Sequence, residues 1–214
     1  MDKLELCSVL PSVFADNDRL CSDVWNSNVT FERGHVYLME SESGKGKSTF
    51  CSYMLGYRND YSGKISFDHE DIKSFTVSNW CDIRKNHISH LFQELRLFPE
   101  LTALENVIIK NNLVGFKEEK EIKDWFEVLG IADKLNVPVR YMSFGQQQRV
   151  ALMRALVQPF DFIIADEPIS HLDDNNAVIM GKMIVAEAQR QGAGIIMTSI
   201  GKHIDMKYEK TLRL

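Results

Sequence analysis

The sequence of 214 residues has no apolar run of the roughly 20 residues that a membrane-spanning helix needs. Its first residues, Met-Asp-Lys-Leu-Glu-Leu, also lack the apolar stretch of a secretory signal. An excess of basic residues is missing too, since the formal net charge is -5. Sequence-independent binding to nucleic acid depends on Lys and Arg side chains that neutralise phosphates. We therefore expect a cytoplasmic protein that reaches a membrane only through a partner and has no nucleic-acid partner.

Cysteine is scarce, and its spacing shows neither a CxxC pair nor the pattern of a metal site. This spacing favours free thiols in a reducing compartment over disulfides or metal ligands. Internal repeats and low-complexity linkers are absent as well. With 44% hydrophobic residues, the chain is long enough for one domain with a sizeable core. The four cysteines are Cys7, Cys21, Cys51 and Cys81.

Short apolar runs alternate with helical stretches along much of the chain. This alternation predicts an α/β architecture with a largely parallel central sheet, because continuous apolar runs are typical of strands covered on both faces. The predicted strands span residues 36–39, 63–67, 162–165 and 194–197, and a predicted helix spans residues 48 to about 57.

The segment from about residue 101 to residue 155 is predicted to be mostly helical. Within it, apolar residues recur at i, i+3, i+4 and i+7, which is the spacing of one helix face, and Gly130 follows as a stop. We interpret this face as core packing and the segment as a candidate subdomain between strands. The four residues of the face are Ile122, Trp125, Phe126 and Leu129.

A glycine-rich loop between a predicted strand and a predicted helix fits a phosphate loop, G-x-x-x-x-G-K-[ST], except at its first position. Glycines allow backbone N–H groups to approach phosphate oxygens, and the following helix adds its positive end. We expect Lys47 to reach the β- and γ-phosphates and the Ser48 hydroxyl to bind Mg²⁺. The alternative is a plain turn before a helix. The predicted nucleotide-binding residues are Ser41, Glu42, Ser43, Gly44, Lys45, Gly46, Lys47, Ser48 and Thr49.

Two positions in this loop carry open questions. Ser41 replaces the first glycine, and it would be strained if that position needed a positive φ. Lys45 either adds a second cation near the phosphates or points to solvent.

Two carboxylates follow the apolar strand 162–165. Ligands of open α/β sheets bind at the carboxyl ends of strands, so we expect Asp166 to hold Mg²⁺ and Glu167 to act as general base toward a water molecule. Successive strand residues face opposite ways, so Glu167 must sit where the strand ends, and Pro168 fits that exit. A solvated acidic turn is the alternative.

Five motifs in a fixed order give the chain a resemblance to the ATP-binding subunit of ABC (ATP-binding cassette) transporters over essentially its whole length. Residues 41–48 resemble the Walker A motif, and Asp166-Glu167 resemble the Walker B end. The segment Leu91-Phe-Gln93 onward resembles the Q-loop, Met142-Ser-Phe-Gly-Gln146 resembles the signature motif LSGGQ, and Ser170-His-Leu-Asp173 resembles the D-loop.

The resemblance implies a P-loop NTPase (RecA-like) core with an N-terminal antiparallel β subdomain and a helical subdomain inserted in the middle. As one domain over residues 1–214, the chain would use about 1–90 and 156–214 for the core with the β subdomain. About 91–155 would form the helical subdomain that carries the signature.

The resemblance also implies roles that spacing alone does not show. Gln93 would contact Mg²⁺ and the attacking water, as a catalytic residue that couples the site to a membrane partner. Phe14 is the candidate for stacking on adenine, with core packing as the alternative. The signature helix, starting near Gln146, would present its positive end to the γ-phosphate of ATP on a second protomer. The residues expected to face that opposite protomer are Ser143, Gly145, Gln146 and Asp173.

Three positions depart from the family pattern. Ser41 is one, and Phe144 replaces a glycine of the signature, where the remaining Ser143 and Gly145 lead us to expect tolerance. The third is Ser199, which stands where the family usually has a catalytic histidine; a serine hydroxyl lacks the reach and charge of imidazole. We therefore expect ATP binding to survive and hydrolysis to be slowed. His203 follows four residues later.

The leading hypothesis is an ATP-hydrolysing subunit that uses ATP and Mg²⁺ to drive conformational change in an integral membrane transporter subunit. Two protomers would close head-to-tail, on the cytoplasmic face of the inner membrane. The segments 91–107 and 146–156 resemble the subgroup that serves lipoprotein release, macrolide efflux and cell division. One alternative is a regulatory ATP-binding subunit with weak hydrolysis. Another is a soluble ABC protein acting on DNA or ribosomes, which the acidic balance disfavours.

Overall fold

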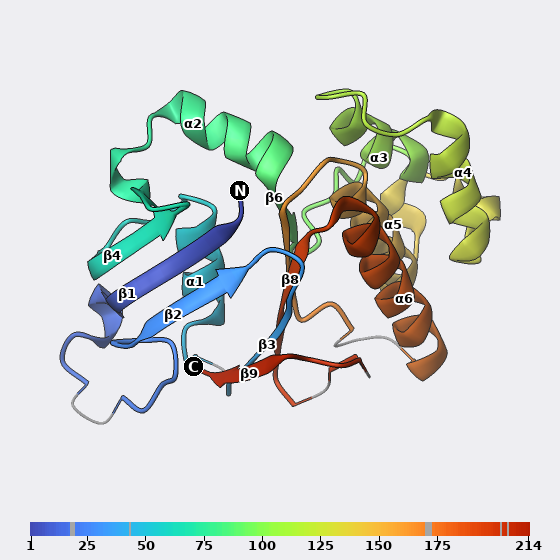
Figure 1. Ribbon diagram of the computed structural model, residues 1–214. Coiled ribbons are helices and arrows are strands. Elements are labelled where there is room, and N and C mark those ends of the chain that lie inside the picture. The colour runs from blue at the N-terminus through green and yellow to red at the C-terminus, as the bar shows by residue number, and fades with distance from the viewer. Residues whose placement is uncertain (18–19, 43, 170–172, 202, 205) are drawn as a thin grey trace.

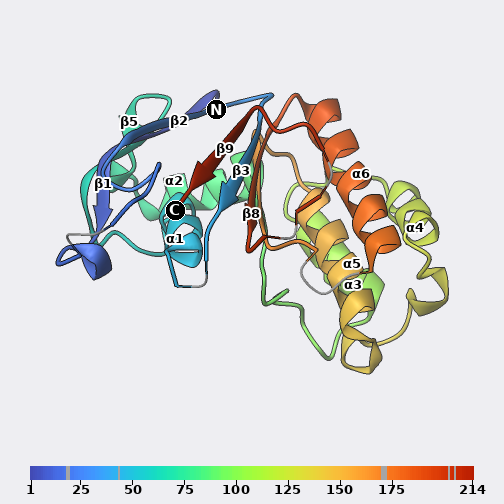
Figure 2. The same ribbon diagram turned by 90° about the horizontal axis from the view of Figure 1, so that it is seen from below.

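The structure is a computed structural model of the 214-residue chain, and it describes all residues except 18–19, 43, 170–172, 202 and 205. The described residues form two sheets (Figure 1). Helix α1 (Lys47–Met54) lies between the sheets, and the helices of the middle segment lie on the other side of the larger sheet (Figure 2).

The smaller sheet is antiparallel, with strand order β2-β1-β4-β5. Apolar residues alternate along its first strand, so that Leu4 and Leu6 are buried against the core. A register shift follows Cys7, where Ser8 has a φ of 49°. Gly63 lies opposite, and a Cβ there would come within 2.3 Å of the Ser8 carbonyl oxygen. The strands are β1 (Lys3–Pro11), β2 (Asn28–Glu32), β4 (Tyr61–Phe67) and β5 (Glu70–Asp71).

The larger sheet has strand order β6-β7-β8-β3-β9, and each neighbouring pair is parallel. Along one central strand, Phe162 and Ile164 pack toward α1, whereas Ile163 and Ala165 pack toward the helices of the other face. Burial on both faces explains the continuous apolar runs and confirms the predicted parallel sheet. The strands are β3 (Val36–Glu40), β6 (Ile88–Leu91), β7 (Phe162–Asp166), β8 (Gly194–Ser199) and β9 (Lys210–Arg213).

The segment between residues 101 and 156 is mostly helical, as predicted, and its helices lie on one side of this sheet (Figure 2). Two of them begin with a capping box, at Thr102 with Glu105 and at Ser143 with Gln146. The predicted apolar face packs into the core through Ile122 and the residues that follow it at helical spacing. The longer helices are α2 (Val77–Asp82), α3 (Ala103–Asn111), α4 (Glu119–Val128), α5 (Phe144–Leu156) and α6 (Asp174–Gln191). The shorter ones span Ser12–Phe14, Ile72–Ser74, Ile83–His87, Ala132–Lys134 and Val139–Tyr141.

Two helix boundaries differ from the prediction. Helix α1 ends at Met54, before the predicted end near Tyr57, because Gly56 adopts a φ of 65° and its Cα packs on the Trp80 ring. Helix α5 begins at Phe144 and not near Gln146, because the Ser143 hydroxyl caps the helix and accepts a hydrogen bond from the Gln146 N–H.

Candidate active site

The loop between β3 and α1 has the backbone of a phosphate cradle. Gly44 and Gly46 adopt φ values of 81° and 107°, a region that side chains with a Cβ rarely enter. A Cβ on Gly46 would also lie 3.0 Å from the Phe14 ring and from the Trp25 indole nitrogen. The sequence therefore needs glycine at both positions. Ser43 lies outside the described residues.

Lys47 is buried at the start of α1, and its ammonium group faces the inside of the loop. Its Nζ donates to the Ser41 carbonyl oxygen at 3.3 Å, to the Ser41 hydroxyl at 3.2 Å and to the Glu42 carbonyl oxygen at 3.3 Å. It also lies 3.6 Å from the Glu167 carboxylate. All these contacts are long, so phosphate oxygens entering the loop could replace them with shorter charge-assisted bonds.

The serine at the first loop position, Ser41, does not have the backbone strain that a positive φ would cause. Ser41 is not among the described non-glycine residues with positive φ, so its backbone has no strain of that kind. Its hydroxyl instead donates to the Glu42 carbonyl oxygen and accepts from Lys47. The side chain of Lys45 is exposed, which fits the solvent-facing alternative. Among the other loop residues, the Thr49 hydroxyl accepts a hydrogen bond from Arg58 at 3.4 Å.

Asp166 and Glu167 leave β7 in different backbone conformations. Asp166 is the buried last residue of the strand and accepts a 2.5 Å hydrogen bond from the Thr198 hydroxyl. Burial raises the pKa of Asp166, while the Thr198 bond and the charge of Lys47 oppose that rise. Glu167 has a φ of 49°, so the chain turns there, where the sequence predicts the strand to end.

The turn brings the Glu167 carboxylate toward other predicted site residues. One of its oxygens accepts from the Gln93 amide nitrogen at 3.2 Å, and the other lies near Lys47. The Glu167 N–H donates to both the hydroxyl and the carbonyl oxygen of Thr198. Thr198 thus holds both carboxylate residues, a role that the sequence interpretation missed. A polar residue at the end of an apolar strand was its only signal.

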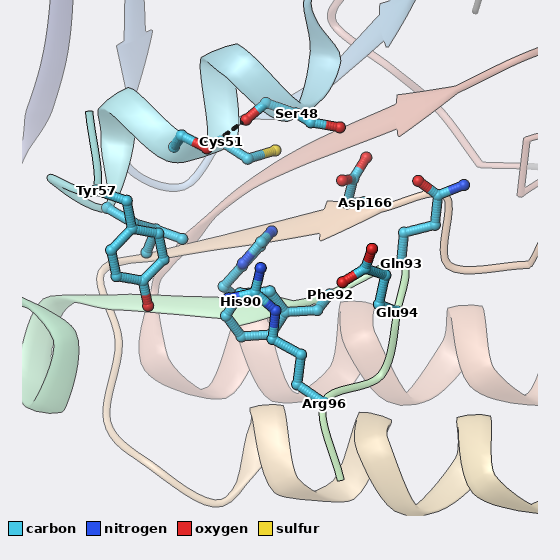
Figure 3. Close-up of a pocket in the computed structure, with 11 residues that line it drawn as sticks. Ser48, Cys51, Tyr57, His90, Phe92, Gln93, Glu94, Arg96 and Asp166 are labelled. Atoms are coloured by element: carbon cyan, nitrogen blue, oxygen red, sulfur yellow. Dashed lines mark hydrogen bonds between the residues drawn. The ribbon is translucent and has the colours of Figure 1, made fainter. Parts of the chain in front are cut away.

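A pocket beside α1 gathers the predicted metal ligands. Ser48, Gln93 and Asp166 all line it, and together they offer a hydroxyl, an amide carbonyl and a carboxylate oxygen (Figure 3). Oxygen ligands of this kind suit Mg²⁺. Cys51 and His90 line the same pocket but were not singled out from the sequence as site residues.

The motif residues around α5 and α6 form local caps. The Ser143 N–H donates to the Gln146 side chain, with Gly145 between them in the first turn of α5. Asp173 caps α6 by accepting from Asn176, which lowers the pKa of Asp173. Among the described residues, no hydrogen bond joins these groups to Lys47. Residues 170–172 of the predicted D-loop lie outside the described part of the chain.

Phe14 and Ser199 lie next to different ends of the phosphate loop. The partly buried ring of Phe14 packs beside Gly46 at the edge of the core. Ser199 is buried at the carboxyl end of β8, and its carbonyl oxygen accepts from the Ser41 N–H at 3.1 Å. His203 lies next to the end of β3, with its Nδ1 at 3.9 Å from the Glu40 carboxylate.

Comparisons with protein families and solved structures place the chain among known proteins. The family model described as ABC transporter matches residues 24–170. The chain belongs to the ABC transporter family. This ABC protein is 31% identical over 191 residues to the uncharacterized ABC transporter ATP-binding protein YclH of Bacillus subtilis (strain 168), covering 87% of the chain and 83% of YclH.

Two further likenesses extend the comparison. The ABC protein is 34% identical over 156 residues to the lipoprotein-releasing system ATP-binding protein LolD 1 of Chlorobium chlorochromatii (strain CaD3), covering 71% of the chain and 63% of LolD 1. The dimeric post-hydrolysis structure of the ATP-binding cassette MJ0796, bound to ADP and Pi, superposes with a TM-score of 0.75 at 25% identity, covering 92% of this chain and 87% of that chain.

These comparisons confirm the predicted fold and family. The ABC protein is an ATP-binding ATPase subunit of the ABC transporter type, with a P-loop NTPase core and an antiparallel sheet beside it. Within the described ranges, no helix has both the length and the apolar character that crossing a membrane would require.

Proposed function

We propose that this ABC protein hydrolyses ATP with Glu167 as general base. The observation that carries the proposal is the backbone of Glu167, whose φ of 49° costs energy in a non-glycine residue. In an extended strand, Glu167 would face away from Asp166. The turn instead directs it to Gln93 and to the side of Lys47. Strain of this kind persists where a function depends on the resulting side-chain position.

The chemistry follows from these positions. Lys47 and the backbone of the phosphate loop hold the β- and γ-phosphates, and the Gln93 amide orients the attacking water. Glu167 accepts a proton from that water while the water oxygen bonds to the γ-phosphorus. The bond from the γ-phosphorus to the bridging oxygen breaks, and its electron pair leaves on ADP.

Mg²⁺ is the cofactor that we assign to Ser48, Gln93 and Asp166. Their oxygen atoms come from α1, from the segment after β6 and from the end of β7, and they line one pocket. When bound, Mg²⁺ would neutralise charge on the phosphates. The Thr198 hydroxyl donates a hydrogen bond to the Asp166 carboxylate and so fixes its position.

We propose that Phe14 stacks on the adenine ring. Its ring lies beside Gly46 and is only partly buried, so part of it remains accessible to a ligand. Core packing is the competing role for this phenylalanine.

The signature residues serve a second protomer in this proposal. Ser143, Gly145 and Gln146 form the N-terminal turn of α5 and are not buried, so they can present N–H groups and a hydroxyl to a phosphate of another chain. Asp173 is an exposed cap of α6, and we assign it to the same interface. Phe144 stands between Ser143 and Gly145 in the sequence, and its ring is exposed. We therefore expect phenylalanine to be tolerated in place of the glycine of the signature.

Replacing Ser143 tests the dimer. We expect Ser143→Ala to weaken ATP-dependent dimerisation of a hydrolysis-deficient protein by about 10-fold, because a hydroxyl contact to a charged phosphate is lost. Sedimentation velocity with and without ATP measures this.

Thr102→Ala is the matched control. Thr102 caps α3 through the same kind of capping box as Ser143 in α5, but it does not face a predicted phosphate. Thr102→Ala therefore loses an equivalent helix-capping bond and no phosphate contact. Equal dimerisation by both variants would contradict the assigned role of Ser143.

A membrane transporter subunit is the partner that we propose. The helical segment 91–155, with Gln93 at its start, would pass movement from the ATP site to that partner, on the cytoplasmic face of the inner membrane. Similarity to LolD 1 supports the lipoprotein-release part of the predicted subgroup. Co-purification from membranes followed by mass spectrometry tests the partner.

Ser199 is proposed to slow turnover. We expect Ser199→His to raise ATP turnover by about 5-fold, the gain from roughly one added hydrogen bond to the γ-phosphate, with ATP binding unchanged. Steady-state phosphate release measures this, and Ser199→Asn controls for side-chain size. No gain in the histidine variant would refute the idea.

A regulatory subunit with weak hydrolysis is the second candidate, favoured by Ser199. It predicts that the unmodified protein releases phosphate no faster than its Glu167→Gln variant.

A further inference from the structure

Three potential metal ligands of different chemistry meet in the pocket beside the phosphate loop. The Cys51 sulfur, a ring nitrogen of His90 and an Asp166 carboxylate oxygen all lie within 4.8 Å of one another. They come from three elements, α1, β6 and β7, that the fold brings side by side (Figure 3). Only Asp166 has a role in the proposed hydrolysis.

His90 is the group that this arrangement leaves unexplained. Both of its ring nitrogens are buried, and neither has a hydrogen-bond partner among the described residues. Burial, helped by the charge of Arg96, lowers the pKa of His90 to about 3, so the imidazole is neutral and has a free lone pair. A buried polar group without a partner costs free energy, and such an exception calls for a ligand or a function.

We propose that Cys51, His90 and Asp166 form a Zn²⁺ site beside the phosphate loop. Thiolate, imidazole and carboxylate are the ligands that zinc binds, whereas Mg²⁺ takes oxygen. The thiolate and the carboxylate supply two negative charges to a divalent cation, and the thiol proton is released to solvent on binding.

The geometry fits an ion of this size. With ordinary zinc bond lengths, tetrahedral ligand atoms lie roughly 3.3–3.6 Å apart. Side-chain rotations that shift the three ligand atoms by about 1 Å would therefore close the site. The pocket has a volume of about 120 Å³, which leaves room for a water molecule as fourth ligand.

The site shares Asp166 with the proposed Mg²⁺ site, and this part of the inference rests on the proposed function. A carboxylate turned toward Cys51 and His90 is withdrawn from the metal of Mg·ATP. Zinc and Mg·ATP then exclude each other, so that zinc acts as an inhibitor of this ATPase.

The binding test uses the full chain with its three exposed cysteines replaced, Cys7→Ala, Cys21→Ala and Cys81→Ala, so that Cys51 is the only thiol. We expect one equivalent of Co²⁺ to give a thiolate charge-transfer band and Zn²⁺ to displace it. In this background, Cys51→Ala and His90→Phe should each weaken zinc binding at least ~10-fold in titration calorimetry. His69→Phe, at an exposed histidine, should not.

Thermal unfolding checks that the Cys51→Ala and His90→Phe variants fold. The Co²⁺ spectrum of the protein that keeps Cys51 and His90 tests the site even if a variant does not fold. No thiolate band there would overturn the site, as would unchanged zinc binding in either folded variant.

A second arm measures binding of a fluorescent ATP analogue with Mg²⁺, and then turnover. We expect zinc to lower analogue binding in the background, and His90→Phe to abolish that effect. If zinc binds but leaves analogue binding unchanged, the exclusion through Asp166 is wrong. Because the cobalt and zinc titrations need no hydrolysis, an inactive ATPase would count against the proposed function and not against the metal site.

Discussion

Glu167→Gln is expected to lower ATP turnover by roughly 10²- to 10⁴-fold while leaving ATP binding intact. The amide cannot accept a proton from water, but it keeps the size of the carboxylate. It can also still contact Gln93, whose amide nitrogen lies 3.2 Å from the Glu167 carboxylate in this structure. Removing the negative charge near Lys47 also leaves that ammonium free to bind phosphate. Phosphate release measures turnover, and equilibrium binding of a fluorescent ATP analogue measures affinity.

The matched control is Glu94→Gln. Glu94 follows Gln93 and lines the same pocket, yet it is exposed and has no role in the proposed chemistry. It undergoes the same chemical change, so its turnover should stay within about 2-fold of the parent. A Glu167→Gln variant that still hydrolyses ATP at the parent rate would remove Glu167 as general base.

Lys117→Met is expected to destabilise the fold by roughly 1.5–3 kcal/mol, because Glu187 loses a buried charge-assisted hydrogen bond and keeps its weaker-placed partners Arg190 and Gln191. The Lys117 side chain is fully buried, and its Nζ donates to Glu187 of α6 at 2.9 Å and also contacts Glu121 of α4. The ammonium lies 4.7 Å from the centre of the Trp125 ring. This one cation thus ties the helical segment to α6. Urea denaturation followed by circular dichroism measures the loss.

Two comparisons sharpen this experiment. Lys123→Met removes an exposed pair with Glu119 in the same helix and should cost no more than about 0.5 kcal/mol. Adding Glu187→Leu to Lys117→Met should recover part of the lost stability, because no buried carboxylate then remains at this position. If Lys117→Met and Lys123→Met unfold at the same urea concentration, the buried Lys117–Glu187 pair stabilises the fold no more than the exposed Lys123–Glu119 pair does.

The local parts of the site were predictable because each is encoded by neighbours in the chain. A phosphate loop needs glycines and a lysine at fixed spacing, and both glycines adopt the positive φ that this requires. The place of Glu167 followed from the two-residue repeat of a strand, and it lies at the turn as predicted. The helix boundaries were less accurate, since Gly56 and the Ser143 cap decide them through single contacts.

The remaining features depend on segments that are distant in the sequence. Whether Ser41 is strained depended on a backbone angle that the sequence does not specify. Thr198 holds Asp166 across 32 residues, and Gln93 meets Glu167 across 74. Only the parallel pairing of neighbouring strands could place them together.

By itself, the sequence determined the phosphate loop, the acidic strand end and the family, because these reside in contiguous motifs whose backbone geometry is local. The tertiary structure alone decided that Cys51, His90 and Asp166 share one pocket and that Lys117 is paired inside the core. The physical reason is that burial and charge pairing are properties of the packed chain, in which strand order and helix docking fix which side chains lose water together.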